Sequence, residues 1–174
     1  MTLVVIEVGI ATTIQDGGRP GLAHLGISPP GAVDPELAVR VNRLGGNRID
    51  AALIETAGNL VVEASSPATV ATSRHAAPVS MRKGARLSVE SGGGRQWHYL
   101  AVRGGLATAS VLGSRSHDTL SGLGAVPLVR PVQARRRRPG ARRPGVHAGR
   151  GSAERRQGGC QAAHRRPGHP GMES

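Results

Sequence analysis

The sequence has few of the residues that usually cross-link a small protein or anchor its core. Cys160 is the only cysteine among 174 residues, which excludes an internal disulfide and a cysteine-based zinc site within the chain. Phenylalanine is absent, and Trp97 and Tyr99 are the only other large aromatic residues. A hydrophobic core must therefore be built from Val, Leu, Ile and Ala, with little aromatic burial.

Long apolar runs are absent as well. No stretch approaches the roughly 20 apolar residues that a membrane helix needs. The apolar start, residues 1–8, is short and lacks a basic region, which favours a first strand over a signal peptide. We therefore expect no membrane association and a cytoplasmic location.

Positive charge is plentiful but unevenly distributed. Lys83 is the only lysine among 23 basic residues, a bias typical of a GC-rich coding sequence. Residues 1–130 carry 12 basic and 9 acidic side chains, whereas residues 131–174 carry 11 basic and 2 acidic ones. The second segment has no leucine, isoleucine or aromatic residue, so it cannot offset a chain entropy of about 1–2 kcal/mol per residue. The sequence predicts a folded domain over 1–130 and a disordered Arg/Gly/Pro-rich tail over 131–174.

The arginine runs of this tail, such as residues 135–138, would bind polyanions at low salt. No aromatic residue lies between them, so bases have nothing to stack on and specific nucleic-acid recognition is not expected. A non-catalytic polyanion-binding protein that acts through its basic tail is therefore the alternative function.

Short β-branched segments separated by turn residues predict a mainly β domain. One helix is expected at residues 35–44: Asp34 is a good N-cap, Pro35 suits the first helical position, and the apolar residues Leu37, Val41 and Leu44 share one face. Seven strands with near-regular spacing favour a barrel or a sandwich. They are expected at residues 3–8, 11–15, 51–56, 59–64, 68–72, 86–90 and 97–103.

Two local patterns have chemical interest. The glycine-rich loop at residues 15–21 offers close backbone approach and an arginine, Arg19, suited to a carboxylate or phosphate. The alternative is a turn in which Asp16 caps backbone amides and Arg19 pairs with an acid. The adjacent residues Ser116, His117 and Asp118 point in different directions, which argues against a hydrolase triad. The histidines show no metal-ligand spacing, and no metal site is expected.

Several segments, taken in order, resemble the N-terminal part of the family formed by the C subunit of 5-oxoprolinase, over about residues 3–128. This family is also called KipA, allophanate hydrolase subunit 2 or the biotin-dependent carboxyltransferase family. The segments are TIQDGGRPG at 13–21, HLG at 24–26, GAVDP at 31–35, NRL at 42–44, GN at 46–47, AALIE at 51–55, YLAVRGG at 99–105, VLGSRS at 111–116 and DTLSGLG at 118–124.

The resemblance implies a cyclophilin-like β-barrel with one short helix. It also implies one component of an ATP-dependent complex, acting on a small molecule with a partner like the B subunit of 5-oxoprolinase or allophanate hydrolase subunit 1. The chemistry would be 5-oxoproline hydrolysis or carboxyl transfer from carboxybiotin to a urea-like acceptor. Either reaction develops an anionic oxygen that arginines and backbone amides can stabilise. ATP and carboxybiotin would belong to the assembled complex, and no cofactor is assigned to this chain. The positions carried over are Asp16, Arg19, Asp34, Glu55 and Arg115 as catalytic candidates, with Asn42 and Ser116 as substrate-binding candidates.

The sequence departs from the family pattern in two places. Residues 73–76 replace a longer stretch with a Thr-Gly loop, and the resemblance fades over residues 125–130, where relatives continue with further strands. We therefore expect an incomplete barrel, hence a truncated subunit that is inactive alone. Because shifted reading of a GC-rich gene yields mostly Arg, Ala, Gly and Pro, we hypothesise that residues 131–174 are translated out of frame.

Overall fold

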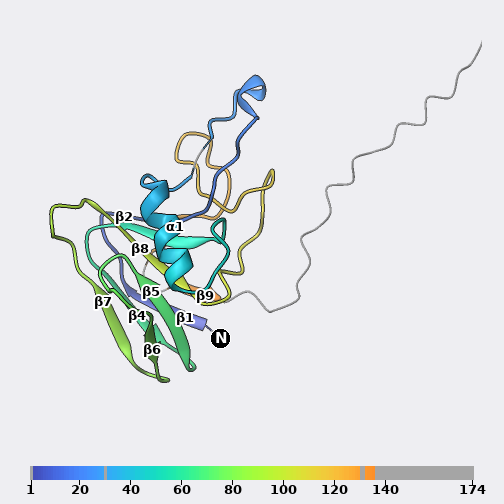
Figure 1. Ribbon diagram of the computed structural model, residues 1–174. Helices are drawn as coiled ribbons and strands as arrows, with labels where there is room; N and C mark the ends of the chain where they lie inside the picture. Colours follow the sequence, from blue (N-terminus) through green and yellow to red (C-terminus); the bar gives the residue numbers. More distant parts are fainter. Residues whose placement is uncertain (1, 30, 130–131, 136–174) are drawn as a thin grey trace, which may run out of the picture. The chain divides into compact units, whose positions relative to one another are not determined.

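The protein is mainly β, as the sequence predicts. The computed structural model describes residues 2–29, 31–129 and 132–135, drawn in colour in Figure 1. The elements are β1 (Thr2–Glu7), β2 (Ala11–Gln15), the 3₁₀ helix η1 (Ala23–Leu25), α1 (Pro35–Leu44), β3 (Leu53–Ala57), β4 (Leu60–Ala64), β5 (Ala68–Thr72), β6 (Val79–Met81), β7 (Arg86–Val89), β8 (Trp97–Val102) and β9 (Val132–Arg135).

The strands form two antiparallel sheets that share one core. The order is β7-β4-β1-β9 in the four-stranded sheet and β2-β3-β8-β5-β6 in the five-stranded sheet. Fully buried side chains of the first sheet, such as Leu3 and Val62, belong to the same hydrophobic cluster as Ile54 and Leu100 of the second. The two sheets therefore pack face to face, as in a sandwich.

The sequence predicts an incomplete barrel, and the described strands form no closed one. The β2 edge of the five-stranded sheet is covered, because a loop segment satisfies the backbone there: His117 N–H donates to Ile14 O and Leu128 N–H to Thr12 O, both at 2.9 Å. With these carbonyls occupied, no further strand pairs with this edge among the described residues.

The predicted helix is confirmed as α1. Asp34 caps it by accepting a hydrogen bond from Leu37 N–H at 3.0 Å, and proline occupies its first turn. Its buried face, including Leu37 and Val41, packs on Ala71 of β5 and Tyr99 of β8. The helix thus lies across one face of the five-stranded sheet (Figure 1).

All seven predicted strands are present, with boundaries within two residues of those expected. Two further strands were not predicted. Strand β6 has only three residues, and β9 pairs with β1 beyond the domain boundary expected at residue 130. The prediction of disorder for the rest of the tail, residues 136–174, lies outside the described residues. Within the part of the chain that the structure describes, no helix is both long and apolar enough to cross a membrane.

Candidate active site

A cavity of about 360 Å³ lies on the helix-bearing face of the five-stranded sheet, next to the start of α1. Cross-strand register creates it: Thr13 of β2 pairs with Glu55 of β3, which pairs with Tyr99 of β8, so that these side chains share the face on which α1 packs. We call this the Glu55 cavity. Its lining is Ala11, Thr13, Gln15, Ser28, Pro29, Gly31, Val33, Glu55, Trp97, His117, Asp118, Thr119 and Leu120.

Glu55 is buried and held in one position. Glu55 is 2% exposed, and its Oε2 accepts hydrogen bonds from Val33 N–H at 2.7 Å and from Tyr99 O–H at 2.9 Å. Tyr99 in turn accepts from Asp34 N–H at 2.8 Å, so it bridges the helix N-cap and the carboxyl group. No hydrogen bond from the described residues reaches the other carboxyl oxygen, Oε1.

The environment favours the protonated form of Glu55. Burial raises the pKa of its carboxyl group above the ordinary value, and this effect exceeds the lowering by the Val33 amide and the Tyr99 hydroxyl. The pKa of the Tyr99 hydroxyl is also raised, chiefly by burial, so this group stays protonated and donates. A carboxyl group with a raised pKa in a cavity is a candidate general acid or base.

The pKa of Asp118, the second acid in the cavity lining, is shifted in the opposite direction. Hydrogen bonds from the Ser121 hydroxyl at 2.6 Å, the Leu120 amide at 3.0 Å and the Ser28 hydroxyl at 3.1 Å hold the pKa of Asp118 below its usual range. Asp118 therefore remains ionised and fixes the turn that it begins. Two carboxyl groups whose pKa values are pushed apart are typical of acid–base sites.

Two buried polar atoms of the lining residues have no partner among the described residues. They are Oε1 of Gln15 and Nδ1 of His117. The Gln15 amide donates to Thr13 Oγ1 at 3.0 Å and to His117 O at 3.1 Å, which fixes its orientation. An unsatisfied buried polar atom costs about 1–3 kcal/mol, so a bound ligand that pairs with these atoms would recover that loss.

The glycine-rich loop forms a buried junction with the 111–118 segment. Asp16 accepts four hydrogen bonds: from Ser114 Oγ at 2.5 Å, Arg115 N at 2.7 Å, Ser116 Oγ at 2.8 Å and Gly18 N at 2.9 Å. The alternative interpretation of Asp16 as a cap of backbone amides is therefore confirmed.

The ion pair expected for Arg19 in that interpretation is wrong. Arg19 is 2% exposed and bonds to carbonyls instead, donating from Nε to Val111 O at 2.9 Å and from Nη2 to Ser116 O at 2.8 Å. Its third nitrogen, Nη1, is buried without a partner in the part of the chain that the structure describes. Asp16, Arg19 and Ser116 thus hold two loops together next to the cavity, and none of them lines it.

The remaining carried-over residues do not line the cavity either. Asp34 caps α1 and pairs with exposed Arg95 at 3.2 Å. Asn42 is buried in α1 and donates to Ala51 O at 2.8 Å, which fixes the segment after the helix. Arg115 donates to Thr108 O at 3.1 Å. Of the seven residues that the resemblance carried over, only Glu55 lines the cavity.

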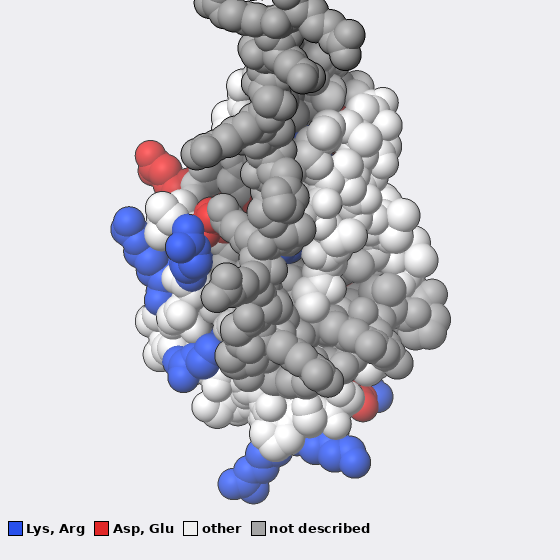
Figure 2. Space-filling model, turned by 90° about the vertical axis from the view of Figure 1, so that its right-hand side faces the viewer, with Lys and Arg blue, Asp and Glu red and all other residues white. Residues whose placement is uncertain are grey.

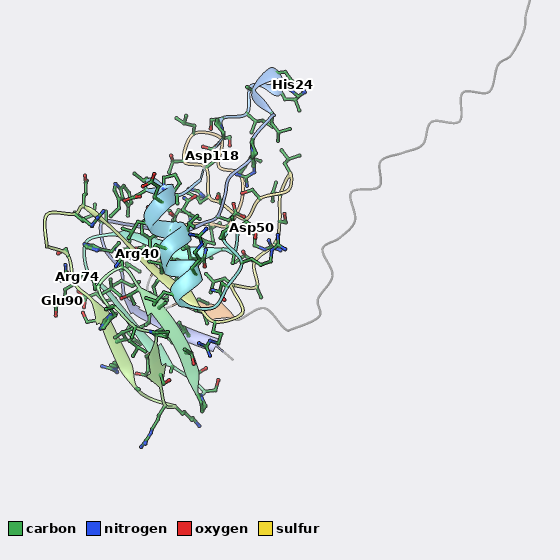
Figure 3. The ribbon with its side chains drawn as sticks, in the orientation of Figure 1. His24, Arg40, Asp50, Arg74, Glu90 and Asp118 are labelled. Carbon is green, nitrogen blue, oxygen red and sulfur yellow. The ribbon has the colours of Figure 1, made fainter. Side chains whose placement is uncertain are left out.

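Sequence reasoning missed Gln15, Trp97, His117 and Asp118 as lining residues. Period-two alternation in β2 would have put Gln15 on the same face as Thr13, but it does not tell which face carries the helix. Figure 3 shows Asp118 on the loops at one end of the sheets, with His24 farther out on η1. Among the described residues, no group of three His, Cys, Asp or Glu side chains is arranged to hold a metal ion. Most of the tail on which polyanion binding depends, residues 136–174, lies outside the described residues.

The fold and cavity define a two-sheet β domain with a cavity lined by two carboxyl groups. A family model, the carboxyltransferase domain, subdomain A and B, matches residues 25–157, and the chain therefore belongs to that family. The match extends past residue 130, beyond the last of the resembling segments. The expected kinship with 5-oxoprolinase is confirmed: the chain is 33% identical over 138 residues to the C subunit of 5-oxoprolinase from Escherichia coli K12.

That alignment covers 71% of this chain and 44% of the relative, so the chain spans less than half the length of this curated relative. Among solved structures, the urea amidolyase of K. lactis has a TM-score of 0.74 at 25% identity, over 79% of this chain and 9% of that one. The urea carboxylase of Kluyveromyces lactis gives the same score and identity, also over 79% of this chain, and 14% of its own length.

Proposed function

We propose that this chain acts as a subunit of an ATP-dependent enzyme that hydrolyses an amide or transfers a carboxyl group to a nitrogen, with the Glu55 cavity as its substrate site. The observation that carries the proposal is the buried carboxyl group of Glu55, fixed through Oε2 by two donors and facing a cavity in a carboxyltransferase-family fold. The names of the relatives, a 5-oxoprolinase subunit and a urea amidolyase, support the choice of C–N chemistry.

Both reactions move a proton at an amide nitrogen. Carboxyl transfer removes one proton from the nitrogen that gains the carboxyl group, and hydrolysis adds one to the nitrogen that leaves. Glu55 is the residue suited to that transfer, because burial raises its pKa and Tyr99 fixes its orientation. The unpartnered Oε1 of Gln15 is an acceptor that would orient a substrate N–H.

The Glu55 cavity does not fit ATP. Among the described residues, neither Lys nor Arg lines it, whereas two carboxyl groups do, and a triphosphate requires cationic or backbone N–H partners. ATP therefore belongs to the partner in this proposal, and no step at Glu55 involves it. The partner would be a protein like the B subunit of 5-oxoprolinase or allophanate hydrolase subunit 1, and the chain alone would be inactive.

The test is a coupled assay of the full chain with such a partner from the same organism. One arm supplies 5-oxoproline and ATP and measures glutamate; the other supplies urea, ATP and bicarbonate and measures ATP turnover. We expect Glu55→Gln to lower kcat by about 10²–10⁴-fold in whichever arm is active, the range for losing a general acid or base.

Glu63→Gln is the matched control. Glu63 is an acid on the four-stranded sheet, paired with Arg86 at 2.9 Å on the surface, so its replacement should leave kcat unchanged. Tyr99→Phe removes a hydrogen bond that lowers the pKa of Glu55, so that pKa should rise further. The limb of the kcat–pH profile that reports Glu55 should then move to higher pH: the acid limb in carboxyl transfer, where Glu55 acts as a base, and the alkaline limb in hydrolysis, where it acts as an acid. Full activity of the Glu55→Gln variant would refute the proposed role.

A further inference from the structure

A second cavity, of about 550 Å³, lies on the same sheet face at the other end of α1. Thr69 of β5, Ser80 of β6 and Arg103, just after β8, share this face, because Thr69 pairs with Ser80 and Arg103 N–H donates to Thr69 O at 2.9 Å. Arg103 Nε also donates to Gly45 O, the residue that ends α1, at 3.3 Å. The helix therefore separates this cavity from the Glu55 cavity.

The polar side chains that line this second cavity are hydrogen-bond donors that carry either a positive charge or no charge. Arg82 and Arg103 supply two guanidinium groups, and Thr69 and Ser80 supply two hydroxyls. The Arg82 guanidinium, the two hydroxyls and both terminal nitrogens of Arg103 make no hydrogen bond with other described residues. These donors are therefore available to a ligand.

The charge of this cavity is opposite to that of the Glu55 cavity. Among the described residues, no Asp or Glu contributes to its lining, whereas the Glu55 cavity contains two acids and no Lys or Arg. Pro67, Ala68 and Met81 complete the lining, with Ala68 and Met81 belonging to the core between the sheets, and the volume is within the range of small-molecule sites. In the side view of Figure 2, Lys and Arg side chains also project from the lower end of the described part, the end at which the β6–β7 turn lies in Figure 1.

We propose that this second cavity binds a small organic oxyanion, a molecule whose phosphate or carboxylate group is held by Arg82 and Arg103. Guanidinium groups bind both kinds of oxyanion through paired, charge-assisted hydrogen bonds. The hydroxyls of Thr69 and Ser80 add neutral donors beside them. This site is distinct from the proposed active site and does not depend on the chemistry at Glu55.

The test uses the backbone amide resonance of Ser80 in the ¹⁵N-labelled full-length chain. Ser80 lines the cavity on β6, so its signal separates binding there from binding to the arginine-rich tail. A Ser80→Ala variant assigns the resonance. Pyrophosphate and citrate are titrated separately at constant ionic strength; they represent the phosphate and the carboxylate form of the ligand.

We expect a saturable shift of the Ser80 amide resonance with at least one of the two probes, and the probe that binds identifies the class. Arg82→Glu should weaken that binding by about tenfold or more, since it replaces a cationic donor with a carboxylate that repels the anion. Arg40→Ala is the control, because Arg40 is an exposed arginine on α1 away from this lining (Figure 3). Absence of a Ser80 shift with both probes, or equal binding by the Arg82→Glu variant, would overturn the proposal.

Discussion

Replacing Asp16 should destabilise the protein more than replacing any exposed carboxylate. Asp16 is the common acceptor for two loops: it takes hydrogen bonds from the hydroxyls of Ser114 and Ser116 and from the amides of Gly18 and Arg115, all between 2.5 and 2.9 Å. In Asp16→Ala, the hydroxyls can rotate to other acceptors, but the two backbone N–H groups cannot.

The magnitude follows from those two groups. A hydrogen bond to a charged acceptor contributes about 1.5–3 kcal/mol, so losing two irreplaceable ones costs about 3–5 kcal/mol. Against a total stability of about 5–15 kcal/mol this is a large fraction. At about 4 °C per kcal/mol for a domain of this size, Tm should fall by about 12–20 °C.

Asp16→Asn tests the geometry. The two amides bond to different carboxyl oxygens, Gly18 to Oδ1 and Arg115 to Oδ2, so either orientation of an asparagine amide faces one backbone N–H with an N–H of its own. Its loss should therefore be about half that of the alanine variant. Circular dichroism melts and urea titrations of the full chain measure both, with Glu63→Ala as the surface control. An Asp16→Ala variant that melts with the wild type would refute this account of the junction.

Three further predictions follow from other residues. Burial raises the pKa of the Glu55 carboxyl group above its ordinary value of 4.5, so the contribution of Glu55 to stability is full below pH 4.5 and is lost as pH rises through the raised pKa. Urea unfolding at several pH values should show the wild type losing stability relative to Glu55→Gln over that window. Parallel curves for the two proteins would contradict this prediction. Gly124→Ala should destabilise the protein by more than about 2 kcal/mol, because the φ of Gly124 is +93° and a Cβ there would overlap Ser116 O. Gly122→Ala is the control: φ is +69° there and the space around it is open, so the same unfolding assay should show a cost of only about 1 kcal/mol. If residues 131–174 are out of frame, translating the other two frames after codon 130 should restore strand-like family sequence, and the hypothesis fails if neither frame does.

Local sequence signals predicted much of the fold. The helix at 35–44 was predictable because an N-cap, a first-turn proline and an apolar i, i+4, i+7 face all agree at Asp34 to Leu44. Strand β6 was missed because its three residues are too few for alternation to show, and it forms through pairing with β5. The packing of two sheets rather than one barrel depends on contacts between distant segments, such as His117 with β2.

The candidate site was only partly predictable, for the same reason. Glu55 was found through a resemblance, while its buried state depends on Val33 and Tyr99, which lie 22 and 44 residues away along the chain. Asp16 and Arg19 were conspicuous in the sequence because glycines and charged residues surround them. In the structure, however, their side chains hydrogen-bond to the 111–118 segment. A conspicuous motif therefore marked the junction beside the cavity rather than its lining.

The arrangement of the helix-bearing face connects these observations. Helix α1 begins beside Glu55 and ends at Gly45, whose carbonyl accepts from Arg103, so each end of one helix borders a different cavity. The acidic cavity lies at the end where backbone amides are exposed, and Val33 N–H there partly offsets the cost of burying a carboxylate. The basic cavity lies at the end where carbonyls are exposed, and Arg103 satisfies one of them while keeping two nitrogens for a ligand. Opposite charges at the two ends therefore match the polarity of the helix, and one short helix borders two cavities of opposite charge on a single sheet.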